Sequence, residues 1–193
     1  MGVETVNQRV VNELWVQLFN TKGIGWLPVL TDSMAPLIRP GDQVQVSAVV
    51  VEEIRFGDIV VFGRGDDLIV HRVLKKWRTP HHIYFLERGD AGYAYDLINA
   101  KNIIGRVMRV KGRGKTFDLR SPLSRLTNLL LSVWFCITSA CVSRLKMSKA
   151  RIATRAGKAL YRVVRVTSRF LVMVCFVVWY LSGLLTQDGG EQT

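Results

Sequence analysis

The stretch "LTDSMAPLIRPGDQVQV", residues 30–46, places an isolated serine just before a tight turn. Pro40 fixes its own φ angle and Gly41 adopts angles that other residues avoid, so "PGD" predicts a turn that opens an alternating strand. This turn chemistry does not account for the pair Ser33-Met34. Taken alone, Ser33 is interpreted as an ordinary turn serine, and only the rest of the chain can give its hydroxyl a chemical role.

Short strand-like segments surround this stretch and are separated by clusters of Gly, Pro and Asp. They read "GWLPVLT", "DQVQVSAVVV", "GDIVVFG", "LIVHRVLKKW", "HIYFLERG" and "IIGRVMRV". Their lengths and spacing predict a mainly β domain over residues 26–120, mostly antiparallel and without a long helix. Within it, "GRGDD" at residues 63–67 predicts a hairpin turn.

His71 lies in the second arm of that hairpin and shares a strand face with Ile69 and Val73. A lone histidine in an apolar setting is more often structural than catalytic. A serine hydroxyl needs a base to remove its proton, however, and a histidine base needs a carboxylate on its far ring nitrogen. The stretch "ERGDAGYAYD", residues 87–96, offers Asp90 and Asp96 in a glycine-rich connection. Strand periodicity alone leaves open whether either of them reaches His71.

Four motifs in order resemble the conserved boxes of type I signal peptidases: "DSMAPLIRPGD", "FGDIVVF", "IVHRV" and "ERGDAGYAYD". The resemblance covers about residues 26–110 and implies an antiparallel β catalytic fold that cleaves peptides without a cofactor or metal. Most bacterial members have Lys at the start of the third box, whereas His71 matches the endoplasmic-reticulum and archaeal kind. The resemblance assigns these roles: Ser33 as nucleophile, His71 as general base, Asp96 as the carboxylate that orients it, Asp90 as a supporting residue, and Thr31 as an aid to the oxyanion site. One departure is Asp32, which replaces the glycine usually found before the nucleophile.

The last third of the chain has a different composition from the β domain. Residues 126–143 and 170–187 carry no charge, and each is close to the roughly 20 apolar residues that cross a bilayer. Between them, residues 144–169 carry nine Lys and Arg and no acid, spaced so that most align along one helical face. Anionic lipid head groups are the expected partner of this basic helix, since only one aromatic residue, Tyr161, lies among the basic ones, too few for a surface that stacks on nucleic-acid bases.

These features predict three parts: an N-terminal amphipathic helix over residues 1–25, the β catalytic domain over 26–120, and a membrane-associated region over 121–193 with two hydrophobic helices. Because positive loops mark the cytoplasmic side, segment 144–169 is expected inside and the catalytic domain outside the inner membrane. If the first hydrophobic segment is instead an interfacial hairpin, the domain stays cytoplasmic. The three cysteines, all in the hydrophobic segments, have neither metal-ligand nor disulfide spacing.

Two further interpretations remain open. A LexA-like self-cleaving repressor shares the Ser-Met box, but it uses Lys as its base and carries a DNA-binding domain, for which residues 1–25 are too short. A non-catalytic membrane adaptor could hold a peptide as an added strand on the β domain. Loss of any one of Ser33, His71 and Asp96 would favour the adaptor, and all three are present. The sequence thus favours a membrane-bound serine endopeptidase whose substrate is a precursor peptide.

Overall fold

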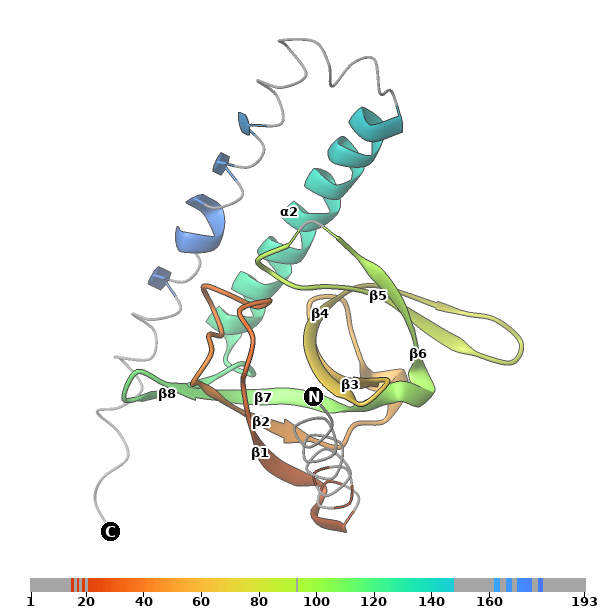
Figure 1. Cartoon of the computed structure of the whole chain (residues 1–193), viewed down its shortest axis with the longest axis vertical. Helices are drawn as coiled ribbons and strands as arrows, with labels where there is room; N and C mark the ends of the chain where they lie inside the picture. Colours follow the sequence, from red (N-terminus) through yellow and green to blue (C-terminus); the bar gives the residue numbers. More distant parts are fainter. Residues whose placement is uncertain are drawn as a thin grey trace, which may run out of the picture.

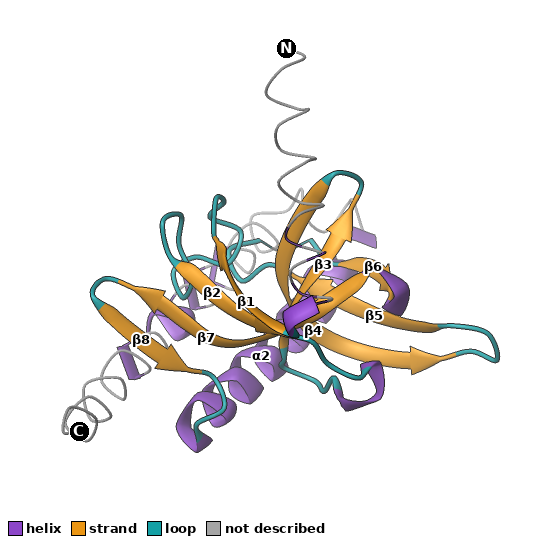
Figure 2. Cartoon of the chain, turned by 90° about the horizontal axis from the view of Figure 1, so that it is seen from below, coloured by secondary structure: helices purple, strands orange, loops and turns teal. Residues whose placement is uncertain are grey.

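The computed structural model describes residues 15, 17, 19, 21–92, 94–147, 162–163, 166–167, 170–174 and 177–178. Its β domain is a single antiparallel sheet that curls into a half-barrel (Figures 1 and 2). The strands are β1 (Ile24–Pro28), β2 (Gln43–Ser47), β3 (Ile59–Arg64), β4 (Asp67–Arg78), β5 (Ile83–Arg88), β6 (Asp96–Asn99), β7 (Ile103–Gly112) and β8 (Lys115–Asp118). Two three-residue 3₁₀ turns, η1 (Val51–Glu53) and η2 (Ala100–Asn102), connect them. The predicted antiparallel β domain is confirmed.

The strand order β1-β2-β7-β3-β4-β5-β6 brings β7 from late in the chain into the middle of the sheet, and β8 pairs with β7. The six strand-like segments of the sequence correspond to β1 to β5 and β7. β6 and β8 have only four residues each and were not anticipated, because so short a run shows no clear alternation. The predicted hairpin is present, with Arg64 opposite Asp67 and Gly65 at a φ of 61°.

Two apolar clusters hold the domain together. The larger contains Met34, Leu37 and Ile38 from the loop after β1, together with residues of β2, β3 and β7. The smaller contains Val60 and Phe62 of β3 packed against β4, β5 and β6. The loop that carries Ser33 is therefore anchored in one cluster, and the strand that carries His71 borders the other.

A long helix, α2 (Pro122–Met147), follows β8 and runs along the sheet (Figures 1 and 2). The hydroxyl of Ser121 caps its first turn by accepting a hydrogen bond from the Ser124 N–H at 3.2 Å, and Pro122 occupies the first helical position, where its missing N–H costs nothing. The helix is longer than the predicted segment 126–143 and enters the basic stretch without a break. It confirms one long helix after the β domain.

The other predicted helices lie largely outside the described residues. Of the second hydrophobic segment, residues 170–174 are helical, and Val172 is buried in the larger cluster. Most of the basic stretch 144–169, much of the N-terminal helix and residues beyond 178 lie outside the described part of the chain. Within the described N-terminal positions, Phe19 is buried and Trp15 stacks on it with ring centroids 6.0 Å apart.

Candidate active site

Ser33 lies in a closed loop between β1 and β2. Backbone hydrogen bonds join the two ends of this loop, from Val29 N–H to the Asp42 carbonyl and from Gly41 N–H to the Val29 carbonyl, both at 2.9 Å. Met34 next to the serine is 1% exposed, so it fixes the middle of the loop to the core. Ser33 itself is only partly buried. The Ser-Met pair thus joins an accessible hydroxyl to a hydrophobic anchor.

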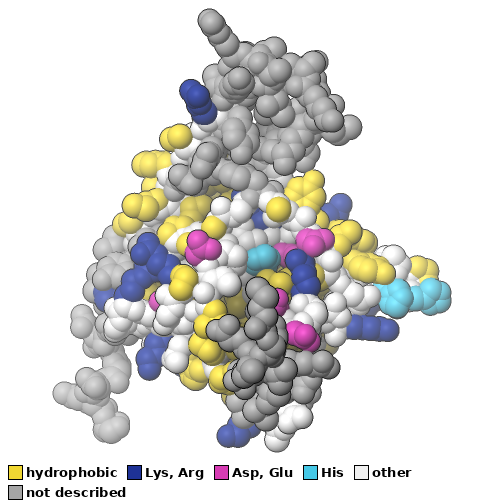
Figure 3. Space-filling view, in the orientation of Figure 1, with side chains coloured by type: hydrophobic (Ala, Val, Ile, Leu, Met, Phe, Trp, Pro, Cys, Tyr) yellow, Lys and Arg dark blue, Asp and Glu magenta, His cyan; other side chains and the backbone are white. Residues whose placement is uncertain are grey.

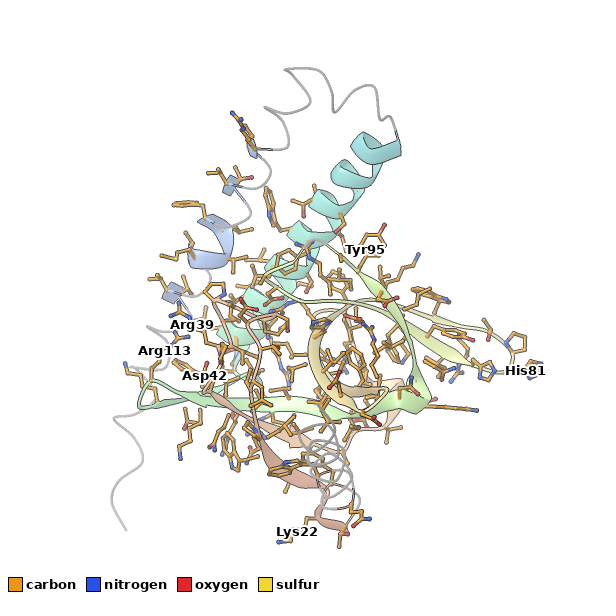
Figure 4. The ribbon with its side chains drawn as sticks, viewed as in Figure 1. Lys22, Arg39, Asp42, His81, Tyr95 and Arg113 are labelled. Carbon is orange, nitrogen blue, oxygen red and sulfur yellow. The ribbon has the colours of Figure 1, made fainter. Side chains whose placement is uncertain are left out.

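A second set of contacts fixes the far side of this loop. The carboxylate of Asp42 accepts a hydrogen bond from the Arg39 N–H at 2.8 Å. The guanidinium of Arg113, in the β7–β8 turn, lies 3.8 Å from the same carboxylate and donates to the Pro36 carbonyl at 3.2 Å. Figure 4 shows Arg39, Asp42 and Arg113 grouped where the loop meets the end of β7. The turn predicted at "PGD" is therefore tied to the sheet from both sides.

His71 lies on β4 with its ring partly buried beside Phe62, the centroids of the two rings being 6.0 Å apart. Its Nδ1 is hydrogen-bonded to Oε2 of Glu87 on β5, and the Glu87 side chain is 1% exposed. A buried carboxylate on Nδ1 favours the tautomer that carries its proton there, which leaves Nε2 as the acceptor. His71 is thus oriented as a general base requires.

Gly89 is where the Ser33 loop and His71 approach each other. A methyl group at this position would lie 2.6 Å from the backbone oxygen of Ser33 and 2.9 Å from Nε2 of His71, so any side chain would clash with both. The adjacent Ala91 N–H donates to the same Ser33 oxygen at 2.9 Å. The structure therefore brings Ser33 to the Nε2 side of His71. His81, by contrast, lies at the far tip of the β4–β5 hairpin (Figure 4).

Thr31 and Asp32 lie beside the serine on the exposed side of its loop. The Thr31 hydroxyl is 3.4 Å from the Ser33 hydroxyl, so the two side chains lie side by side. The Asp32 backbone oxygen accepts from the Ala35 N–H at 2.9 Å, while its side chain is exposed to solvent. Solvent screens the Asp32 carboxylate, which reduces its repulsion of a negative charge developing near Ser33.

Asp96, the expected partner of His71, is paired with a different residue, Arg64. Asp96 lies on β6 directly opposite Glu87, so it is one strand further from β4 than Glu87 is. Its carboxylate is 65% exposed and lies 3.2 Å from Nη2 of Arg64, which also donates to Oε1 of Glu87 at 2.7 Å. In this arrangement Glu87 is the carboxylate on His71, and Arg64 bridges Glu87 to Asp96.

Asp90 is placed in a buried network behind the site. Its two oxygens accept from Nε and Nη2 of Arg72 at 2.8 and 2.7 Å, and both side chains are completely buried. The remaining guanidinium nitrogen, Nη1, donates to Oδ1 of Asn128 on α2 at 2.8 Å and to the Gly57 carbonyl at 3.2 Å. Asp90 therefore fixes the loop after β5, which contains Gly89, to α2.

Sequence reasoning missed Glu87, although it begins the quoted stretch "ERGDAGYAYD". Strand alternation was the available signal, because Glu87 lies opposite Val73, which shares its face of β4 with His71. Using that signal requires knowing that β4 and β5 pair, and in which register. Among the described residues, no group of three or more His, Cys, Asp or Glu could hold a metal ion.

Comparison with known protein families identifies one family that covers most of the β domain. Residues 3–108 match the family model described as Peptidase S24-like, which includes Ser33, His71, Glu87 and Asp96. No curated protein matches the chain. The matched region ends within β7, so the family match covers neither β8 nor the helix α2.

Proposed function

The chain belongs to the Peptidase S24-like family, whose members are serine peptidases of the LexA and signal-peptidase type, and on that premise we propose that it is a membrane-bound endopeptidase. It would remove a leader or signal peptide from an exported precursor, with Ser33 as nucleophile and His71 as base. The observation that carries this proposal is the convergence at Gly89 of the Ser33 backbone and Nε2 of a carboxylate-bound histidine.

In the proposed reaction, the Ser33 hydroxyl attacks the scissile carbonyl carbon while His71 Nε2 accepts the hydroxyl proton. The resulting imidazolium is stabilised by Glu87 and then gives its proton to the leaving amine, which releases the first product. A water molecule, deprotonated in the same way, hydrolyses the acyl group from Ser33. The Ser33 N–H and the Thr31 hydroxyl are the proposed donors to the tetrahedral oxyanion.

We assign the orienting role to Glu87 rather than Asp96. A carboxylate orients a catalytic histidine through a direct hydrogen bond, and Glu87 makes this bond from a buried position. In this proposal Arg64 holds the second oxygen of Glu87 through its hydrogen bond, and Asp96 acts on Glu87 only through Arg64. Asp90 keeps the supporting role, now with Arg72 as its partner.

Membrane association is proposed from α2, whose residues Pro122–Ala140 are long and apolar enough to cross a bilayer by composition and length. The extracytoplasmic placement of the catalytic domain requires this helix to cross. Its packing against the sheet, through Asn128 and Ser139, weighs against crossing. Membrane association is proposed whether or not α2 crosses the bilayer.

The direct test incubates the detergent-solubilised protein with a precursor that carries an Ala-x-Ala site, followed by mass spectrometry of the products. With the wild type we expect one cut after the second small residue. With Ser33→Ala we expect no cut, because the attacking hydroxyl is absent while the buried Met34 still anchors the loop. An intact precursor together with cleavage of the chain itself would favour the self-cleaving alternative. An intact precursor without self-cleavage would contradict the peptidase assignment.

A further inference from the structure

The helix α2 buries several polar side chains and exposes a row of apolar ones. Its buried residues include Ser124, Thr127, Asn128, Ser132 and Thr138, beside Leu131 and Phe135 of the larger cluster. Between Leu123 and Ile137, six large apolar side chains are 40–53% exposed, and Arg125 is the exposed charged residue in this range: Leu123, Leu126, Leu129, Leu130, Val133 and Ile137. Their steps of three and four residues align them in one stripe. A helix on the surface of a soluble domain normally has the opposite arrangement.

Packing joins α2 to the β domain along most of its apolar length. Near its start, Asn128 binds the buried Arg72. Near its end, Arg88 lies 4.2 Å from the centroid of the Phe135 ring and donates to the Ser139 hydroxyl at 3.1 Å. At 1.5 Å per residue, the contacts from Asn128 to Ser139 extend over roughly 16 Å, more than half of the ~30 Å hydrocarbon core of a bilayer.

This packing excludes an orientation in which α2 crosses the bilayer along its normal. A crossing helix would carry β4 and β5, with the buried Arg72 and Arg88, to hydrocarbon depth, together with the polar edges and loops of the sheet. Open sheet edges and irregular loops are not tolerated in contact with lipid chains. With α2 packed in this way, a membrane can reach the apolar stripe only from the side of the helix.

The positive charge at and beyond the end of α2 indicates what kind of surface the apolar stripe contacts. Residues 144–169 carry nine Lys and Arg and no acid, and the chain as a whole has a formal charge of +12. A second copy would bring the same positive charge against this region, whereas an anionic lipid surface attracts it. Further exposed apolar side chains follow the basic stretch, including Phe170 and Met173, and Figure 3 shows hydrophobic side chains gathered where Figure 1 places residues 162–178.

We infer that α2 is an interfacial helix, which lies in the plane of an anionic membrane with its Leu123–Ile137 stripe inserted among the acyl chains. The stripe enters to a depth of about 5–10 Å, and the β domain remains in water on the same side as the basic stretch. Anionic lipids give the cytoplasmic leaflet its negative surface potential, so this side is the cytoplasmic one. The inference deepens the proposed membrane association and does not depend on the proposed peptidase chemistry.

Spin labels on the full-length protein measure this orientation directly. Single cysteines replace Leu123, Leu126, Leu130, Val133 and Ile137 in turn, in a background with the native cysteines changed to alanine, and power saturation gives the depth of each label in phosphatidylglycerol–phosphatidylcholine vesicles. A label at Leu97, which is 53% exposed on β6, is the matched control outside the stripe. We expect all five stripe labels at nearly the same shallow depth and the Leu97 label in water.

Two other depth profiles would overturn the inference. Depths that rise to a maximum near Leu130 and fall again toward Ile137 mean that α2 crosses the bilayer. Labels that all remain in water, with spectra broadened as protein concentration rises, mean that a second copy covers the stripe. Neither readout uses peptidase activity, so failure of the inference is distinguishable from failure of the proposed function.

A binding measurement separates the contributions of the stripe and of the charge. We expect Leu126→Asn with Leu130→Asn to weaken vesicle binding at least about tenfold, because two apolar side chains no longer enter the acyl region. Leu97→Asn should leave binding unchanged. Replacing the anionic lipid by phosphatidylcholine should also weaken binding at least about tenfold. Equal binding of the double variant and the Leu97 control would contradict the assignment of the stripe.

Discussion

Glu87 gives the site its most specific chemical feature, because a buried carboxylate on Nδ1 determines which nitrogen of His71 can accept a proton. Asp96 and Glu87 lie opposite each other on adjacent strands, and both contact Arg64, yet only Glu87 is hydrogen-bonded to the histidine. This difference of one strand separates their proposed roles. It also makes the two residues a natural pair for comparison.

Glu87→Gln should lower kcat by orders of magnitude, since a neutral amide stabilises neither the Nδ1–H tautomer nor the imidazolium. Asp96→Asn should lower kcat by about tenfold or less, because its carboxylate is exposed and acts only through Arg64. Steady-state kinetics of both variants on the same precursor provide the measurement, with circular dichroism as the folding control. If Asp96→Asn is the more damaging change in a folded protein, Asp96 orients His71 and our assignment is incorrect.

Gly89→Ala tests whether the Ser33 loop and His71 really meet at this position. The added methyl group would push against both the Ser33 oxygen and His71 Nε2, so we expect a loss of activity of about a hundredfold or more and a loss of roughly 1–3 kcal/mol in stability. Gly63→Ala is the control, because a methyl group there has no neighbour within 4 Å. Equal, small effects of the two changes would show that the site is more open than described.

Helix α2 supports the site through the chain of contacts from Asn128 to Arg72 to Asp90. The three side chains are buried, and Asp90 lies next to Gly89. An interfacial helix is therefore connected to the loop that brings Ser33 and His71 together. Through these contacts, we expect α2 to affect catalysis although it lies outside the matched family region.

Asn128→Ala should destabilise the protein by about 1–3 kcal/mol, because one guanidinium nitrogen of the buried Arg72 loses its side-chain acceptor. We also expect lower kcat, as the loop after β5 loses part of its support. Ser132→Ala is the control on the same face, since its hydroxyl donates only to the Asn128 carbonyl within the helix, at 2.7 Å. Urea unfolding and steady-state kinetics measure both effects, and indistinguishable variants would argue against the connection.

The turn from β8 into α2 depends on pH through Asp118. Hydrogen bonds from the Arg120 side chain are the main cause that lowers the pKa of Asp118 from 3.8 to about 2. A lowered pKa stabilises the fold above the unfolded pKa near 4, and this stabilisation is lost as pH falls toward 2. Because the Asp118 side chain is 35% exposed, solvent screens its ion pair, and we expect Asp118→Asn to cost below about 1 kcal/mol at pH 6 and less at pH 3. Urea unfolding at both pH values measures this difference, and a larger cost at pH 3 would contradict it.

Viewed as a whole molecule, the β domain follows closely from its sequence, because alternating strands and Gly-rich turns are local signals. The loop of Ser33 and the strand of His71 were both predicted from such signals together with the motif order. The partner of His71 was not, because pairing between β4 and β5 depends on register that a single sequence does not show. The orientation of α2 was not predicted either, since a composition that permits crossing says nothing about which face packs on the sheet.

The central claim is that Ser33 is the nucleophile that carries the acyl group, and trapping this intermediate tests it most directly. The protein is mixed with a peptide ester that mimics the small-x-small end of a signal peptide, quenched in acid within the first turnover, and digested for mass spectrometry. The account predicts an added acyl mass on the fragment that contains Ser33, absent in Ser33→Ala and in His71→Ala. An acyl group on a different residue, or ester cleavage that persists in Ser33→Ala, would contradict it.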